Sequence, residues 1–185
     1  MRGLILGIIL MGAGLIAAEV KTDAPRFTPD NQMIRPEGYR QWMFLSSGLG
    51  MSYQKDAGYN DDPVFTNVYI RPEAYRQFTA EGTFPEGTVL VLEIYSATRE
   101  ASINKQGHFQ DRFIGIEAAV KDSNRFAEKW AYFGFIGDDG KPLAQAEPFR
   151  KEACWTCHNQ NAAVDNVFVQ FYPILREAQE KKNTP

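Results

Sequence analysis

The amino-acid sequence predicts an α+β fold: a predominantly antiparallel β-sheet of about five strands, with flanking helices and a C-terminal helix. Three observations predict it. Several segments rich in β-branched and aromatic residues alternate with polar residues or run apolar, as strands do. The connections between these segments are too short for the crossover helices that parallel strands need. Near the C-terminus, apolar residues recur with a helical period.

The strands are expected in order along the middle of the chain. Residues 88–95, 112–120 and 130–136 have the strongest patterns, and residues 42–47 and 64–70 have weaker ones. The Gly-Asp-Asp-Gly sequence at residues 137–140 is a turn signal. Turns of this kind favour hairpin connections between neighbouring strands.

Two similar segments each predict the start of a helix. Residues 34–42 and 70–78 agree at seven of nine positions, and each has a proline, Pro36 or Pro72, where a first helical turn would lie. The C-terminal helix is expected to start near Asp165, which is a good N-cap residue. Pro173 is then expected to kink this helix, because proline removes a backbone donor.

The first residues have the pattern of a secretory signal peptide. Residues 1–18 combine the charged Arg2, an apolar run and a small Ala17-Ala18 cleavage site. This predicts cleavage and a periplasmic or otherwise secreted protein with no membrane span in its mature form. An uncleaved anchor is the alternative, although the run is shorter than the ~20 residues that a spanning helix needs.

The rest of the chain is expected to form one unit. Residues 19–33 are polar, contain Pro25 and Pro29, and predict a flexible leader. Residues 34–185 are the right length for a single domain with a proper core. The formal net charge is −3 at pH 7. A nucleic-acid partner is not expected, because the sequence has no basic stripe to contact phosphates.

The chain has only two cysteines and two histidines, and three of these four residues stand together in Cys154-Trp155-Thr156-Cys157-His158. A c-type haem is joined to its protein by two thiols, and the histidine beside the second thiol binds the haem iron. The spacing therefore predicts one covalently attached haem c, held by Cys154 and Cys157, with His158 as an axial iron ligand.

Two other uses of the cysteines remain as alternatives. A disulfide or redox Cys-X-X-Cys pair is typical of a thioredoxin-like βαβ unit, and no such pattern surrounds residues 154–158. A zinc site needs four ligands. Beside the two cysteines, the only soft ligands are His158 and His108.

The chain resembles the cytochrome P-460 and cytochrome c′-beta family over most of its predicted mature length. The matches are Tyr39-Arg-Gln-Trp42, Val68-Tyr-Ile70 with Pro72-Glu73, Gly87-Thr-Val89, Ile114-Gly-Ile-Glu-Ala118, Val120-Lys121, Trp130-Ala131, Cys157-His158, Ala162, Asp165, Val167-Phe168 and Tyr172-Pro-Ile-Leu175. The resemblance implies a mostly antiparallel sheet, a C-terminal haem c and iron with an open distal side. Many members are homodimers, so a homodimer is expected.

The resemblance also implies which residues distinguish two branches of the family. In the hydroxylamine-oxidising branch a lysine is cross-linked to the haem, and a distal arginine and a second-sphere carboxylate have been associated with the pocket. The residues matched to these three are Leu92, Thr66 and Ala146. None carries the group in question, so the chain is closer to the c′-beta branch, which lacks the cross-link and binds nitric oxide in an apolar pocket.

Other residues are secondary candidates for the pocket. Phe65, with Phe113, Phe133 and Phe135, is a candidate for a ring that roofs the distal face. Lys105 is the candidate for a cross-link from a different position. The candidates for a sixth iron ligand are His108, Met33, Met43 and Met51, each of which also fits a loop or core role. Glu93 and Glu117 lie inside strand patterns and are expected to face solvent or pair with a base.

These residues favour a secreted haem protein with five-coordinate iron that binds nitric oxide or a similar small ligand. An apolar pocket suits a neutral gas. One alternative is a hydroxylamine or nitric oxide oxidoreductase that passes electrons to a soluble cytochrome, a reaction that a distal base would assist. A six-coordinate electron-transfer cytochrome is the other alternative.

Overall fold

Five consecutive strands form the main sheet of the protein. The structure, a computed structural model, describes residues 24–52 and 63–183. The strands β2 (Met43–Leu49), β3 (Val64–Ile70), β4 (Val89–Thr98), β5 (Phe109–Lys121) and β6 (Trp130–Gly134) lie side by side in chain order, and every pairing is antiparallel. The predicted α+β fold, with its antiparallel sheet and C-terminal helix, is confirmed.

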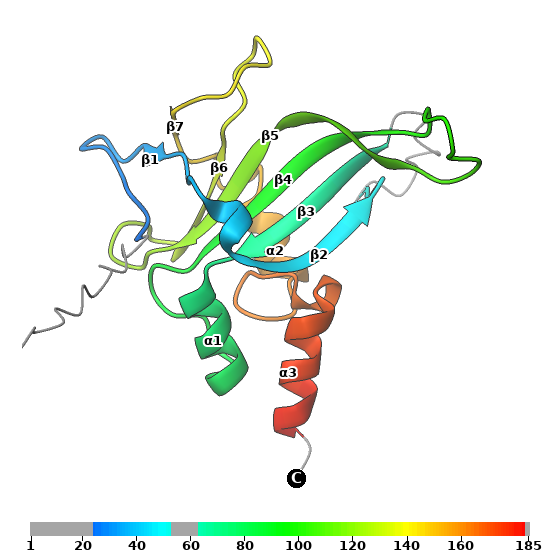
Figure 1. The fold of residues 1–185 in the computed structure, drawn as a ribbon. Coiled ribbons are helices and arrows are strands. Elements are labelled where there is room, and N and C mark those ends of the chain that lie inside the picture. Colours follow the sequence, from blue (N-terminus) through cyan, green and yellow to red (C-terminus); the bar gives the residue numbers. More distant parts are fainter. Residues whose placement is uncertain (1–23, 53–62, 184–185) are drawn as a thin grey trace, which may run out of the picture.

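Shorter elements surround this sheet. They are the small pair β1 (Met33–Ile34) and β7 (Gln145–Ala146), the helices α1 (Pro72–Glu81), α2 (Trp155–Asn161) and α3 (Pro173–Asn183), and the 3₁₀ helices η1 (Tyr39–Gln41) and η2 (Val169–Phe171). Figure 1 shows α1 and α3 side by side at one end of the sheet, with α2 behind the strands. The β1–β7 pair lies away from these helices.

The two faces of the main sheet carry separate cores. Successive side chains of a strand point to opposite faces, so Leu90 packs in a cluster with α1 and α3 residues such as Phe78 and Leu175. Its neighbour Val91 packs in a second cluster with Met33 of β1 and Phe133 of β6. The first cluster belongs to the helix side of the sheet, and the second to the side that the N-terminal segment covers.

Of the two similar segments, only the second forms an α-helix. Residues 70–78 lead into α1, which begins at Pro72 as predicted. In residues 34–42 the chain makes only the 3₁₀ turn η1, so the helix expected there is wrong. Gly38 has a φ of 68°, a left-handed conformation that interrupts a right-handed helix, whereas Ala74 at the matching position stays within α1.

The start predicted for the C-terminal helix is also wrong. Asp165 has a φ of 44° and lies in a tight turn, and α3 begins only at Pro173. Proline has no N–H to donate and restricts the residue before it, so it suits the first position of a helix better than the interior. No kink follows, because Pro173 is where the helix begins.

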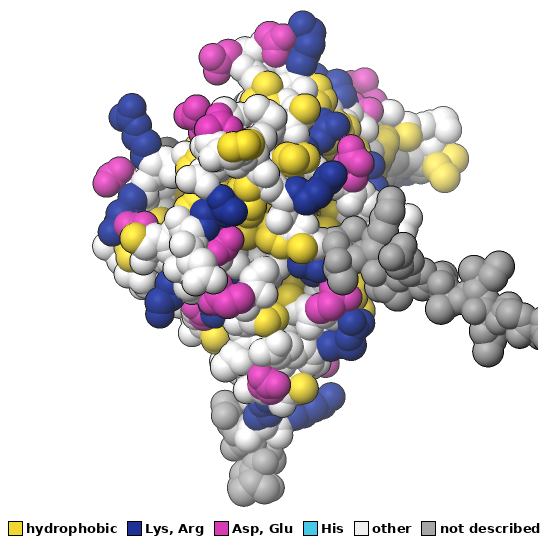
Figure 2. All heavy atoms as spheres, turned by 90° about the vertical axis from the view of Figure 1, so that its left-hand side faces the viewer, with side chains coloured by type: hydrophobic (Ala, Val, Ile, Leu, Met, Phe, Trp, Pro, Cys, Tyr) yellow, Lys and Arg dark blue, Asp and Glu magenta, His cyan; other side chains and the backbone are white. Residues whose placement is uncertain are grey.

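Part of the predicted leader is packed against the folded protein. Phe27 pairs with Met33 in an isolated β-bridge and contacts the rings of Phe126 and Phe133. The predicted signal peptide, residues 1–18, lies outside the described residues. Within the described residues, no helix is long and apolar enough to span a bilayer. Acidic and basic side chains are interspersed on the face that Figure 2 shows.

Candidate haem site

The Cys-X-X-Cys-His motif forms the start of α2 and faces a cavity. Residues three and four apart lie on one side of a helix, so Cys154, Cys157 and His158 all line the same hollow of about 280 Å³. Its other wall comes from β3, β4, β5 and β6. The helix side of the sheet therefore lies across this hollow from the motif.

The ring of His158 is held in one orientation. Its Nδ1 lies 2.8 Å from the backbone oxygen of Asn166. A carbonyl oxygen can only accept a hydrogen bond, so Nδ1 carries the proton and Nε2 has the lone pair that a metal needs. The rings of Tyr132 and Phe168 lie with their centroids 4.4 Å from that of His158.

Burial favours the neutral forms of both His158 and Cys154. The pKa of His158 is lowered by burial, against an opposing effect of its hydrogen bond to Asn166. The pKa of the Cys154 thiol is raised to about 11 by burial, with contributions from Glu117 and Cys157. A redox-active cysteine typically has a lowered pKa. The environment of Cys154 therefore favours an attachment role over thiol–disulfide exchange.

The sheet wall of the cavity is mostly apolar. Val68, Leu90 and Leu92 line it from β3 and β4. Leu92 is the residue that the family resemblance matched to the cross-linking lysine, and its side chain lines the cavity. Among the described residues that form this lining, none is a lysine, arginine or methionine, and His158 is the single histidine.

One acidic residue, Glu117, lies among the apolar residues of this wall. Glu117 lies opposite Leu92 in the β4–β5 register and lines the cavity. Burial raises the pKa of its carboxyl group. No hydrogen bond or ion pair joins Glu117 to another side chain in the part of the chain that the structure describes. The cavity thus contains a half-buried carboxyl group for which the described residues provide no partner.

The chemistry of this cavity fits a c-type haem. Two thiols and an imidazole with a free Nε2 stand on one wall, facing an apolar surface. The side-chain Nδ2 of Asn166, another lining residue, is buried without a hydrogen-bond partner. A buried donor without an acceptor is unusual in a finished fold, and a group with polar edges in the cavity could supply one.

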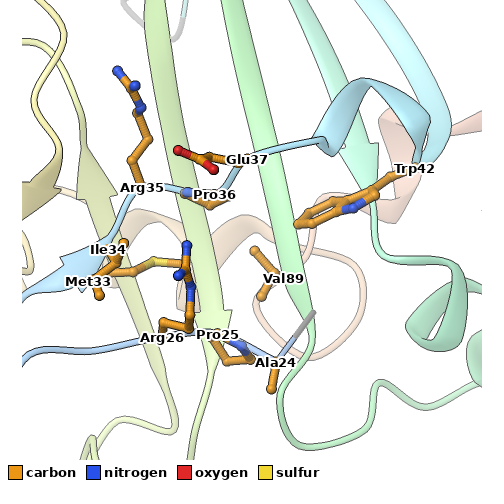
Figure 3. Close-up of a pocket in the computed structure, with 10 residues that line it drawn as sticks. All are labelled: Ala24, Pro25, Arg26, Met33, Ile34, Arg35, Pro36, Glu37, Trp42 and Val89. Carbon is orange, nitrogen blue, oxygen red and sulfur yellow. The ribbon is translucent and has the colours of Figure 1, made fainter. Parts of the chain in front are cut away.

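A second cavity, of about 360 Å³, lies on the other side of the sheet (Figure 3). Met33, Trp42 and Val89 are among its apolar lining residues, and Arg26 and Glu37 also line it. It contains no cysteine and no histidine. The larger cavity therefore has none of the groups that attach a haem, and the smaller one has all of them.

Five of the predicted pocket residues lie away from the motif. Phe65 alternates with Thr66 and Val68 along β3, which turns its ring to the face opposite the cavity. Phe113 contacts Tyr95, and Phe133 and Phe135 pack in the cluster on that same opposite face. Ala146 belongs to this cluster as well, in β7. The strand register thus places all of them across the sheet from His158.

The remaining candidates, Thr66, Lys105 and His108, do not line the cavity either. Thr66 shares the cavity face of β3 with Val68, two residues away, but does not line the cavity. Lys105 is exposed in the loop between β4 and β5. In that region His108 contacts Arg99 through its Nε2. Neither Lys105 nor His108 lines the cavity.

Sequence reasoning missed several residues that the structure brings to the site. Glu117 was expected to face solvent or pair with a base, and Tyr132, Asn166 and Phe168 were not considered as site residues. A partial signal was present for Glu117. Once Leu92 is assigned to the cavity, a hairpin register that pairs β4 with β5 places Glu117 directly beside it.

These features are those of a c-type cytochrome, a protein that binds haem and its iron, built here on an antiparallel sheet. The family model described as Cytochrome P460 matches residues 36–169, which is most of the chain. The protein belongs to the cytochrome P460 family. A search of curated proteins gave no match.

Proposed function

We propose that this protein carries one haem c attached through Cys154 and Cys157, with His158 as the axial ligand, and binds nitric oxide or a similar small ligand. The observation that carries the proposal is the cavity lining, in which Leu92 occupies the matched lysine position and the described residues include no histidine other than His158 and no methionine. The described residues therefore support a five-coordinate iron, with His158 as its one protein ligand, and a haem without a lysine cross-link.

When bound, the haem would supply an iron that can take a small ligand, with His158 as the protein residue that holds it. The protein residues prepare the site for this. The backbone oxygen of Asn166 accepts a hydrogen bond from Nδ1–H of His158, which leaves the Nε2 lone pair free. Val68, Leu90 and Leu92 provide an apolar wall, which favours a neutral gas over water or a charged ligand.

The optical spectrum of the ferrous protein tests this proposal. We expect a high-spin spectrum that changes when nitric oxide is added. The red-shifted band characteristic of a cross-linked haem would contradict the absence of a cross-link. Sharp low-spin α and β bands without added ligand would contradict the open position.

The axial ligand is tested by His158→Ala, with His108→Ala as the matched control. Both variants should retain a haem that survives denaturing electrophoresis, because the thioether bonds come from Cys154 and Cys157. Only His158→Ala should change the iron coordination seen in the spectrum. An equal change in His108→Ala would contradict the assignment of His158.

Glu117 favours a second candidate function, the oxidation of hydroxylamine or nitric oxide with electrons passed to a soluble cytochrome. A carboxyl group with a raised pKa in a cavity can exchange a proton with a bound amine near neutral pH. Hydroxylamine turnover with an artificial electron acceptor tests this. Turnover that is lost in Glu117→Gln but kept in Glu93→Gln would support it, and no turnover in the unmodified protein would reject it.

The proposed location and assembly are tested separately. We propose export to the periplasm, followed by haem attachment there, and a homodimer in solution. Expression with and without residues 1–18 should give the holoprotein only when the segment is present. Light scattering should give a mass near twice that of one chain, and a monomer at micromolar concentration would reject the dimer.

A further inference from the structure

The carbonyl group that holds His158 belongs to a tight turn formed by residues 164–167. Val164 and Val167 exchange backbone hydrogen bonds, with N···O distances of 2.8 and 3.4 Å. The two central residues, Asp165 and Asn166, have φ values of 44° and 61°. Aspartate and asparagine tolerate this left-handed conformation better than other side chains, but glycine alone adopts it without strain. The turn therefore needs support from its surroundings.

That support comes from two strands. One carboxylate oxygen of Asp165 lies 2.7 Å from Nζ of Lys121, at the end of β5. The other accepts a hydrogen bond of 3.1 Å from the indole Nε1 of Trp130, at the start of β6. Lys121 also donates to the backbone oxygen of Phe84 at 2.8 Å, and its side chain is only 15% exposed. Asp165 is thus joined to the rigid end of the sheet.

The same turn presents one acceptor to two donors. The backbone oxygen of Asn166 receives the Nδ1–H of His158 at 2.8 Å and the hydroxyl of Tyr132 at 3.3 Å. A phenolic hydroxyl is an O–H donor at neutral pH, so Tyr132 can donate to this oxygen. The two donors share the electron density of a single oxygen, so the hydroxyl weakens the bond that this oxygen makes with His158.

We propose that Asp165 is a positioning residue that sets the donor strength of His158 toward the haem iron, acting through the turn of residues 164–167, and that Tyr132 opposes it. The inference rests on the proposed ligation of iron by His158. A strong hydrogen bond at Nδ1 raises the basicity of Nε2 and fixes the direction of the ring. The clamp of Lys121 and Trp130 on Asp165 keeps this bond short, and the Tyr132 hydroxyl moderates it.

The proposal predicts opposite effects for two substitutions. Asp165→Gly keeps the left-handed backbone accessible but removes both contacts with the sheet, so the bond between His158 and Asn166 should weaken. Tyr132→Phe keeps the ring against His158 and removes only the competing hydroxyl, so the same bond should strengthen. Asp165→Asn should have an intermediate effect, because its amide oxygen can still accept from Trp130 while the ion pair with Lys121 is lost.

The experiment is resonance Raman spectroscopy of the ferrous holoprotein, with the iron–histidine stretching frequency as the readout. We expect a shift to lower frequency in Asp165→Gly, a smaller one in Asp165→Asn, and a shift to higher frequency in Tyr132→Phe. His158 should also dissociate from iron about tenfold more readily in Asp165→Gly, a typical effect of losing a supporting hydrogen bond. Asp139→Asn is the matched control, because Asp139 pairs with Lys141 at 2.8 Å in another turn.

The outcomes separate this inference from the proposed function. An iron–histidine band that is present and unmoved in both Asp165→Gly and Tyr132→Phe rejects the inference alone. A shift in the same direction for both variants also rejects it, because the two changes would then act only by loosening the site. No iron–histidine band in the unmodified protein rejects the ligation by His158 itself. If Asp165→Gly fails to fold, Tyr132→Phe and Asp165→Asn still decide the direction.

Discussion

Two glutamates on adjacent strands, Glu93 and Glu117, have opposite environments. Glu93 of β4 is 2% exposed and accepts hydrogen bonds from the Tyr39 hydroxyl at 2.7 Å and the Arg40 Nε at 2.6 Å. Glu117 of β5 faces the other side of the sheet, lines the haem cavity, and has no such partner among the described residues. The fold thus supplies hydrogen-bond partners for the carboxylate on one face of the sheet, whereas the described residues supply none for the carboxylate on the other face.

The difference follows from what each carboxylate does. Arg40 lies over the rings of Tyr39 and Phe113, with centroid distances of 5.2 and 5.6 Å, so the cation that balances Glu93 is itself held in place. The contacts of Tyr39 and Arg40 with Glu93 and Phe113 join η1 to strands β4 and β5. Glu117 contributes no comparable link, and burial of an unpaired carboxyl group costs free energy. An unpaired carboxyl group that lines a cavity although it destabilises the fold is a candidate for function.

The largest effect is expected from Arg40→Ala. Removal of this half-exposed cation leaves the buried Glu93 with neutral donors such as the Tyr39 hydroxyl, which should lower the free energy of unfolding by about 2 kcal/mol. Urea denaturation measures the loss. The control is Arg76→Ala, which removes an exposed partner of Glu73 and should cost at most ~0.5 kcal/mol. Equal losses in the two variants would mean that the Glu93 cluster is no more important than a surface pair.

Glu117→Gln should change the pH dependence of stability. Because burial raises the folded-state pKa of Glu117 above its unfolded value of roughly 4.3, its contribution to stability is complete below that pH and lost as pH rises through the folded pKa. The variant should lack this decline and be more stable than the unmodified protein near pH 7. Urea midpoints between pH 4 and 8 measure it, and Glu73→Gln is the exposed control. Identical slopes would remove the contrast with Glu93.

Leu92→Lys gives Glu117 the kind of partner that Glu93 already has. The two residues are directly opposite each other in the β4–β5 register, so an ammonium group there should form an ion pair with Glu117 and lower the pKa of its carboxyl group. The decline in stability above the unfolded pKa should then disappear, as in Glu117→Gln. A persistent decline would show that the two side chains do not meet. The optical spectrum would also reveal any cross-link to the haem.

The smallest effect is expected from Glu93→Gln on ligand binding. This substitution lies across the sheet from the cavity and should leave the spectrum and the nitric oxide dissociation rate unchanged. Glu117→Gln should alter that rate, because it replaces the one carboxyl group among the described residues of the lining. Stopped-flow measurements compare the two variants. An effect of Glu93→Gln as large as that of Glu117→Gln would contradict the separation of the two faces.

Local patterns were sufficient for much of the fold. The five strands could be predicted because alternation and β-branched composition are properties of neighbouring residues. The helix start at Pro72 could be predicted for the same reason, but the one expected in residues 34–42 was wrong. A single glycine, Gly38, has a left-handed conformation there. The start of α3 was misplaced because Asp165, a good N-cap by type, serves instead as the anchor of a turn through contacts with Lys121 and Trp130.

The sequence by itself determined the candidate haem motif, because the two thiols and the imidazole of residues 154–158 are close together in the chain and need only one helical turn to face the same way. It also determined the sheet, whose signals are local. Tertiary structure decided which face each strand residue occupies. It thereby separated Glu117 from Glu93 and took Phe65 and Ala146 away from the cavity. A shift of one residue in register reverses every side chain of a strand, so these assignments depend on contacts between segments far apart in sequence.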